Sequence, residues 1–332
     1  MEDETVQFLR QTNRNQLLLH RRKLRDEESD SRRSNFSISS ENIKDIVNIL
    51  KTKTSISVTE LSALKNMLND DRKTMELVLS VNGALRGLIR ELTGNDIAKQ
   101  CQAAGCICNL ALGDSRAGVA VTKSAGPYLI AALDNLTTEL AVTCAWTIGN
   151  LAGSGPRACD LLVSQGAVSK LAGLLSHSTQ DVRDAGLEAL VHFVYTVEDL
   201  KSDHLDRIVV AVQKLDLSEQ TSQILFYLSC QEDFTASLLA EEYILKIINI
   251  VVEKIEHSLN KENEQFIFLT RTLANMCDKS VYTLILNMLM ERNLCCQMKK
   301  MLQCEHAEII LWLLGNMFNI CGEHLFFMEL LR

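Results

Sequence analysis

Proline and aromatic residues are scarce in this sequence. It has two prolines in 332 residues, and phenylalanine, tyrosine and tryptophan together make up 5% of it. An all-β fold needs many turns, so this composition disfavours that class. Hydrophobic residues nevertheless reach 47%, in a chain too long for one compact core. Strand patterns are nearly absent, and we therefore expect an all-α protein.

Signals for catalysis and for metal binding are also missing. None of the seven histidines stands in a recognisable nucleophile or zinc-protease context, and no glycine-rich phosphate loop is present. Cys295, Cys296, Cys304 and His306 could supply four soft ligands, but their spacing does not match that of zinc sites. We expect no enzymatic activity, no cofactor, no metal and no small-molecule substrate.

The cysteines and the apolar segments bear on the compartment. The eleven cysteines are an odd number, lie mostly within helical patterns and follow no signal peptide, which indicates the reducing cytoplasm or nucleus. The most apolar stretch, residues 309–331, contains Asn316, Asn319, Glu323 and His324. A central charge costs about 2.5 to 3.5 kcal/mol on membrane insertion, so a membrane span is disfavoured.

A repeat is the strongest signal that is present. Three similar stretches, Gln102–Ala111, Val142–Ala152 and Glu308–Met317, each end on asparagine and small or apolar residues. The asparagine-type position recurs at 36 to 48 residue intervals, at Asn66, Asn109, Asn150, Val191, Tyr227, Asn275 and Asn316. A period of this size is typical of stacked helical repeats, and we expect about seven.

Glycines mark the turns inside the repeats. Gly83, Gly126 and Gly166 each lie between two apolar runs, where a tight helix-to-helix turn can use the positive φ that glycine allows. Around Gly166 the spacing predicts helices over residues 157–163, 168–175 and 181–195.

The first forty residues have a different character. Six cationic side chains and no acidic one lie between Thr5 and Arg25, in a chain whose net charge is −8. A serine-rich stretch follows. An acidic body with a basic arm favours basic protein partners, or contact between arm and body, over nucleic acid.

Two motifs resemble the importin-alpha family. On the third helix of its armadillo repeats that family carries tryptophan four residues before asparagine, and the stretch Ala145–Gly153, with Trp146 and Asn150, is similar to it. In the arm, Arg25–Glu27 followed by Arg32 and Arg33 resembles the family's importin-beta-binding segment.

The resemblance implies a fold and a function. The fold is a right-handed superhelical solenoid of three-helix armadillo repeats over residues 41–332, preceded by a basic, partly disordered arm over residues 1–40. The function is that of a nuclear import adaptor, present in cytoplasm and nucleus, which binds basic localisation-signal peptides in a concave groove and an importin-beta-type carrier through the arm. The carrier-binding residues are then Arg21, Arg22, Lys23, Arg25, Arg32 and Arg33.

The groove residues follow from the repeated pair. An indole attracts a cargo lysine or arginine by roughly 0.5 to 2 kcal/mol, and an asparagine one turn later can clamp the cargo backbone. The expected groove residues are Asn109, Trp146, Asn150, Asn275, Trp312 and Asn316.

Several repeats lack one or both residues of this tryptophan–asparagine pair. Gly105 stands in the tryptophan slot before Asn109, Leu187 and Val191 replace both residues of their pair, and Arg271 precedes Asn275. An arginine facing the groove would repel a basic peptide, so we expect weak or altered cargo binding. The apolar residues near Arg332 lack a following repeat, which predicts an array that is incomplete at its C-terminal end.

Two alternatives stay open. The chain is also similar to the divergent importin-alpha-like relative named for transmembrane and coiled-coil domains, which joins a basic segment to degenerate armadillo repeats. Alternatively it is a non-transport armadillo scaffold, in which Trp146 fills a gap between repeats and Asn150 bridges helices.

Overall fold

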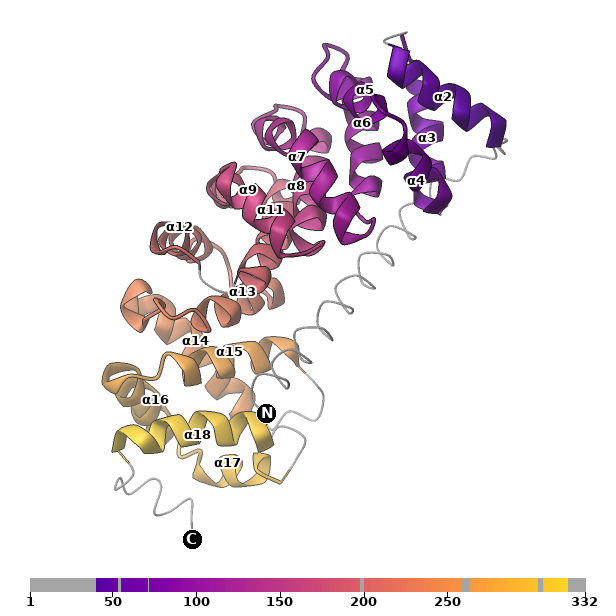
Figure 1. Ribbon diagram of the computed structural model, residues 1–332. Coiled ribbons are helices and arrows are strands. Elements are labelled where there is room, and N and C mark those ends of the chain that lie inside the picture. Colours follow the sequence, from indigo (N-terminus) through magenta and orange to yellow (C-terminus); the bar gives the residue numbers. More distant parts are fainter. Residues whose placement is uncertain are drawn as a thin grey trace. The chain divides into compact units, whose positions relative to one another are not determined.

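Every regular element among the described residues is a helix (Figure 1). The structure, a computed structural model, describes residues 40–52, 55–70, 72–197, 200–257, 263–303 and 307–321. The helices are α2 (Ser40–Thr52), α3 (Val58–Asp70), α4 (Arg72–Ser80), α5 (Ala84–Leu92), α6 (Ile97–Leu110), α7 (Ser115–Ala132), α8 (Thr138–Gly153), α9 (Pro156–Ser164), α10 (Ala167–Leu174), α11 (Gln180–Thr196), α12 (Ser202–Val212), α13 (Glu219–Ser229), the 3-10 helix η1 (Ala236–Leu238), α14 (Glu241–Glu256), α15 (Glu264–Asn275), α16 (Lys279–Glu291), α17 (Cys295–Met301) and α18 (Ala307–Cys321). The all-α prediction is confirmed.

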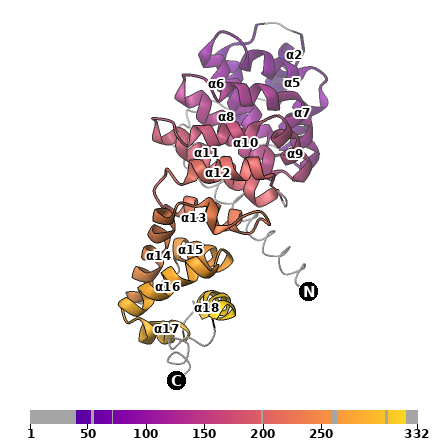
Figure 2. The same cartoon turned by 90° about the vertical axis from the view of Figure 1, so that its left-hand side faces the viewer.

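The chain divides into two compact units, Met1–Gln165 and Gly166–Arg332. In the first unit, α3, α6 and α8 pack side by side in one row, and α2, α5, α7 and α9 form a second row against it. In the second unit, α11, α13, α15 and α18 form the corresponding row, and Figures 1 and 2 show α15 beside α18 from two directions. We call the row containing α3, α6 and α8, and the row containing α11, α13, α15 and α18, the third-helix row of its unit.

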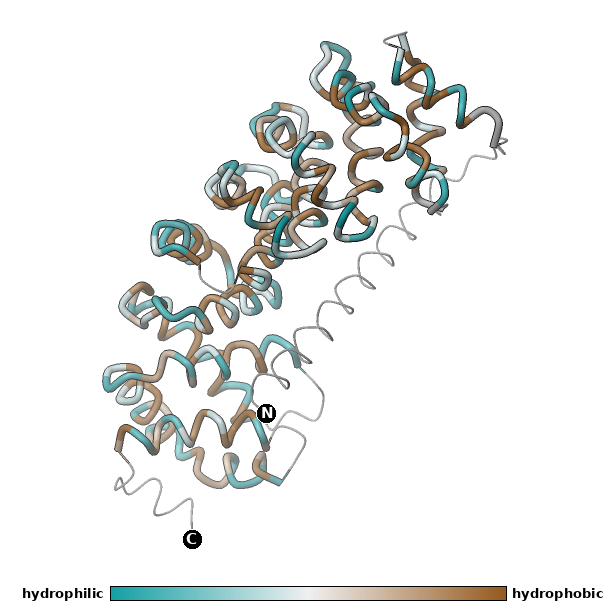
Figure 3. The backbone as a smooth tube through the Cα atoms, in the orientation of Figure 1, coloured by the Kyte–Doolittle hydropathy of each residue, from teal (hydrophilic) through white to brown (hydrophobic). Residues whose placement is uncertain are grey.

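The predicted repeat is confirmed by these rows. Each of the seven marker positions falls on a different helix of a third-helix row, from Asn66 on α3 to Asn316 on α18. Two residues before the marker, Leu64, Ile107 and Ile148 of the first unit are fully buried. Along the tube of Figure 3, hydrophobic residues follow the helix faces that are turned toward neighbouring helices. Each helix therefore buries its apolar stripe against the next repeat, as stacking requires.

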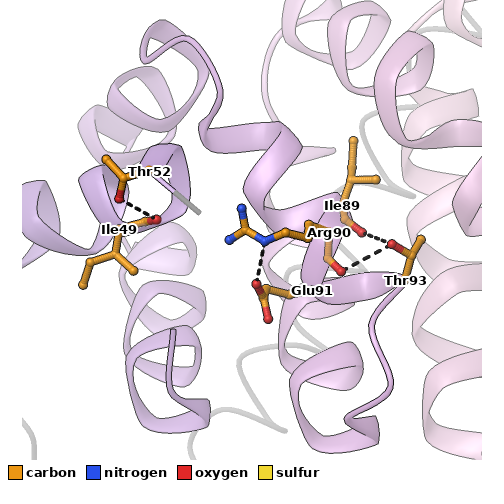
Figure 4. Close-up of polar contacts among 6 residues, drawn as sticks. All are labelled: Ile49, Thr52, Ile89, Arg90, Glu91 and Thr93. Atoms are coloured by element: carbon orange, nitrogen blue, oxygen red, sulfur yellow. Dashed lines mark hydrogen bonds and ion pairs between the residues drawn. The ribbon is translucent and has the colours of Figure 1, made fainter. Parts of the chain in front are cut away.

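The helix ends are satisfied locally. At the start of α3, Ser57 and Glu60 form a capping box, with Ser57 N donating to Glu60 Oε2 at 2.7 Å and Glu60 N donating to Ser57 Oγ at 3.2 Å. At the end of α5, the Thr93 hydroxyl donates to the carbonyls of Ile89 and Arg90, at 2.9 and 3.3 Å (Figure 4). Such bonds take up backbone groups that a helix end leaves without intrahelical partners.

The glycine predictions are confirmed at two positions and wrong at the third. Gly83 and Gly166 precede α5 and α10 with φ of 99° and 87°. Around Gly166 the three predicted helices appear as α9, α10 and α11, with ends within one residue of the expected ones. Gly126, however, lies inside the continuous helix α7, just before Pro127. Its missing side chain leaves room for Gln165, because a Cβ at Gly126 would overlap the Gln165 carboxamide. The glycine there serves close packing and makes no turn.

The cysteines of the described residues form no disulfide. Cys106 and Cys159 are fully enclosed in helix packing, and burial raises the pKa of each thiol to about 12. Within the described part of the chain, no three histidine, cysteine, aspartate or glutamate side chains gather as a metal site would need. Cys304 and His306 lie outside the described residues.

No helix in the described ranges combines the length and apolarity that crossing a bilayer demands. The apolar stretch singled out in the sequence is described as far as Cys321, where α18 ends.

Candidate peptide-binding surface

The exposed tryptophan of the first unit lies on α8. Trp146 is 38% exposed, although Ala145 and Thr147 beside it are fully buried. Glu139, two turns earlier, is exposed as well. Residues seven apart on a helix share a face, so the indole and the carboxylate lie on one face, about 10 Å apart along the helix. That pair of groups suits a basic side chain, whose stem can lie on the ring while its charge is attracted to the carboxylate.

The asparagines of the first unit are turned toward the preceding helix. Asn109 donates from Nδ2 to the Lys65 carbonyl at 2.8 Å, and Asn150 donates from Nδ2 to Cys108 Sγ at 3.4 Å. Their exposed fractions are 8% and 9%. Each amide therefore links neighbouring repeats and is largely buried.

Sequence reasoning missed Lys65. The tryptophan slot at Gly105 is covered by the aliphatic stem of Lys65 from α3, since a Cβ built on Gly105 would lie 2.5 Å from Lys65 Cδ. Burial raises the pKa of the nearby Cys101 thiol, Glu139 raises it further and Lys65 opposes both. The negative charge of Glu139 and the positive charge of Lys65 thus both act on the Cys101 thiol. A glycine at the tryptophan position indicates room for a long side chain from another helix. The sequence does not show which residue supplies that side chain.

The second unit carries its own candidate residues. Trp312 on α18 is 56% exposed. Asn316 donates from Nδ2 to the Trp312 carbonyl on its own helix, at 2.9 Å. Asn275 is exposed and donates to Ser229 Oγ at 3.0 Å, on the preceding α13. Leu187 and Val191, at the degenerate rung of α11, are buried in the packing.

A chain of aromatic rings, also missed from the sequence, crosses this row. Tyr195 on α11 meets Tyr227 on α13 at 5.3 Å between ring centroids, and Phe226 lies 5.5 Å from Tyr227. Phe226 also lies 5.9 Å from Phe268 on α15. Arg271 places its Cζ over the Phe226 ring, 5.7 Å from the centroid. We call Tyr195, Phe226, Tyr227 and Phe268 the aromatic row.

The predicted carrier-binding residues lie outside the described part of the chain, so their roles stay predictions. They are Arg21, Arg22, Lys23, Arg25, Arg32 and Arg33.

Comparisons with known proteins agree with the repeat architecture. The chain is 27% identical over 286 residues to importin subunit alpha-9 of Arabidopsis thaliana, a match that covers 80% of this chain. It spans about half the length of that relative, 54%. No protein-family model matches the chain.

One solved structure shows a similar fold, and a second is reported for comparison. The crystal structure of an engineered protein is similar with a TM-score of 0.66 and 20% identity, covering 83% of this chain and 68% of that one. A designed armadillo repeat protein is similar with a TM-score of 0.48 and 14% identity, over 83% of this chain and 98% of that protein.

The helical repeats and their stacking define an armadillo repeat protein. Its sequence is, more narrowly, similar to that of an importin alpha subunit.

Proposed function

We propose that this chain is an importin-alpha-like transport adaptor, which binds a basic localisation-signal peptide on the third-helix row of its first unit and an importin-beta-type carrier through residues 10–33. It would act in the cytoplasm and nucleus. The observation that carries the proposal is Trp146, exposed on the same helix face as the Glu139 carboxylate. The similarity to importin subunit alpha-9 supports it.

The basic peptide is proposed to contact α8 first. Asn109 and Asn150 already bond to the preceding helix, so they contribute mainly by fixing the spacing of α3, α6 and α8. Asn275, Trp312 and Asn316 remain proposed contacts of the second unit. Arg271 stands next to them on the row and opposes a basic side chain there.

A peptide-binding measurement tests the groove. Trp146→Ala should weaken binding of a lysine- and arginine-rich localisation-signal peptide by roughly 1 to 3 kcal/mol, as expected for an aromatic anchor. Fluorescence anisotropy of the labelled peptide gives the affinity. Tyr128→Ala is the matched control, because Tyr128 is an aromatic of 47% exposure on α7, in the opposite row. Equal affinities for Trp146→Ala and the unaltered chain would exclude this groove.

A carrier pulldown tests the adaptor role. Arg32→Ala with Arg33→Ala should reduce capture by an importin-beta-type carrier, while Arg116→Ala with Lys123→Ala, on the exposed face of α7, should not. The same loss of charge occurs in both pairs, so a general effect of charge would affect them equally.

The second candidate function is a non-transport armadillo scaffold. Lys65 over Gly105 and Arg271 over Phe226 favour it, since both put positive charge on surfaces where a basic peptide would bind. No capture by the carrier, with a peptide surface that is still active, would favour this scaffold over the adaptor.

A further inference from the structure

Arg271 lies on an aromatic surface formed with a neighbouring helix. It lies on α15, half-buried, with its guanidinium over the ring of Phe226 on the neighbouring α13. Among the described residues no carboxylate forms an ion pair with it. A guanidinium stacked on a ring keeps its N–H groups directed outward in the plane of the group, where they can bind a carboxylate with two parallel hydrogen bonds.

Arg271 has few charged neighbours on α13, α15 and α18. It is the only cationic residue in the sequences of α13, α15 and α18. The acidic residues of these helices, Glu219, Glu264 and Glu308, all lie in the first turn. Glu264 is seven residues from Arg271, or about 10 Å along the helix at 1.5 Å per residue. Among α13, α15 and α18, the middle of the helices therefore carries a single positive charge.

The surroundings of that charge are apolar and partly open. Phe226, Phe268 and Tyr195 are half-buried, and Tyr227 is 7% exposed. Neighbouring helices pack about 8 to 10 Å apart, so an extended chain, at about 3.3 to 3.6 Å per residue, would place roughly three residues on each helix. Side chains two apart on such a chain share a face, so a carboxylate on the face turned to the helices can meet Arg271 while apolar side chains on that face meet the rings beside it.

We propose that α13 and α15 bind an extended peptide segment that carries an acidic side chain among apolar ones on the face turned to the helices, with its glutamate or aspartate carboxylate held by Arg271 and the apolar side chains on the aromatic row. The occupant is an acidic peptide because one cation suits one carboxylate, whereas a nucleic acid backbone needs several. This goes beyond the proposed function, in which a basic peptide first contacts α8 in the other unit; Asn275, one of its proposed contacts in the second unit, also lies on α15.

Two matched peptides test the charge requirement. Two labelled eight-residue peptides with leucine at alternate positions, one leucine being replaced by either glutamate or glutamine, differ only in charge. Their affinities for the full chain are measured by fluorescence anisotropy, and the glutamate peptide should bind about five- to tenfold more tightly. Equal affinities, or no binding of either peptide, would overturn the proposal.

Variants of this chain locate the effect. Arg271→Gln should lower the affinity for the glutamate peptide to that for the glutamine peptide, whereas Arg271→Lys, which keeps the charge, should retain part of the difference. Arg207→Gln is the matched control, because Arg207 is an exposed arginine paired with Asp203 on α12 at 3.0 Å. The proposal fails if Arg207→Gln and Arg271→Gln have the same effect.

The Phe226 ring and the first unit are tested separately. Phe226→Leu removes the ring under the guanidinium and leaves the charge, so it should reduce the preference for glutamate. Trp146→Ala should leave the binding of the glutamate peptide unchanged. Loss of that binding in Trp146→Ala would assign it to the first unit and contradict the proposal, whatever the fate of the basic peptide.

Discussion

Two basic side chains occupy or cover tryptophan positions of the third-helix rows in different ways. Lys65 covers the slot at Gly105 from the preceding helix, and Arg271 occupies the slot of its own helix. Lys65 opposes binding of a basic peptide in two ways. Its charge repels the peptide, and its aliphatic stem fills space that a bound side chain could use. It lies on the same row as Trp146, the proposed anchor for a basic peptide.

Lys65→Ala should therefore strengthen binding of the basic peptide by about two- to fivefold, because it removes a like charge and uncovers Gly105. Anisotropy with the labelled peptide measures it. Lys123→Ala, which removes an exposed lysine from α7 on the opposite row, is the control and should have little effect. Unchanged or weaker binding by Lys65→Ala would mean that this lysine does not obstruct the site.

At the scale of the helix, two glycines around α10 provide a matched pair for stability. A Cβ at Gly166 or at Gly173 would meet no atom within 4 Å, but only Gly166 has a positive φ, of 87°. Gly166→Ala should lower the free energy of unfolding by about 1 to 2 kcal/mol, since the left-handed conformation is unfavourable for alanine. Gly173→Ala should raise it by about 0.5 to 1 kcal/mol. Denaturant unfolding monitored by circular dichroism measures both, and a shared sign would contradict the turn assignment.

The cap of α16 makes a stability contribution that depends on pH. Asp278 Oδ1 accepts from the backbone N–H of Ser280 at 2.8 Å and of Val281 at 2.9 Å. Burial raises the pKa of this carboxyl, but the bonds from Val281 and Ser280 together outweigh burial, so its pKa lies below the usual value.

A carboxyl whose pKa is lowered by folding stabilises the folded state above its unfolded pKa of about 3.9 and loses that contribution as the pH falls through the folded value. Asp278→Ala should thus cost about 1 kcal/mol at pH 7, and the difference from the unaltered chain should shrink below about pH 4. Asp206→Ala, an exposed position inside α12, controls for the general loss of an acidic side chain. Thermal unfolding at several pH values tests it, and a difference independent of pH would rule out the charged cap.

The helices themselves were predictable from the sequence, and the side-chain surface was only partly so. The recurring asparagine position and the apolar spacing located the third helix of every repeat, because burial against neighbours enforces both. The turn predicted at Gly126 was wrong, because a glycine that permits close packing looks the same in a sequence as one that permits a turn. Lys65 and the aromatic row were not predicted, because they depend on which side chains of adjacent repeats meet. The apolar pattern of a single helix does not show how it is aligned with the next helix.

For the whole molecule, the notable contrast is between a basic segment near the N-terminus and a chain with a net charge of −8. The sequence around Arg22–Arg25 resembles a localisation signal, so we expect it to compete with cargo for the third-helix row of the first unit. Deleting residues 1–40 should then raise the affinity for the basic peptide, most clearly at low salt, where charge attraction is least screened. An unchanged affinity would dispose of this internal competition.

Helix α7 has a mechanical consequence for the opposite row of the first unit. Where a turn was expected, eighteen residues form one rod, with Pro127 inside it. Proline has no N–H, so the carbonyl of Lys123 lacks the bond that a regular helix would give it, and the rod is softest at that point. Hydrogen–deuterium exchange should accordingly find one protected segment with a fast-exchanging centre. Flexing there would let the two halves of the rod follow different neighbours, α5 and α9, without unwinding either half.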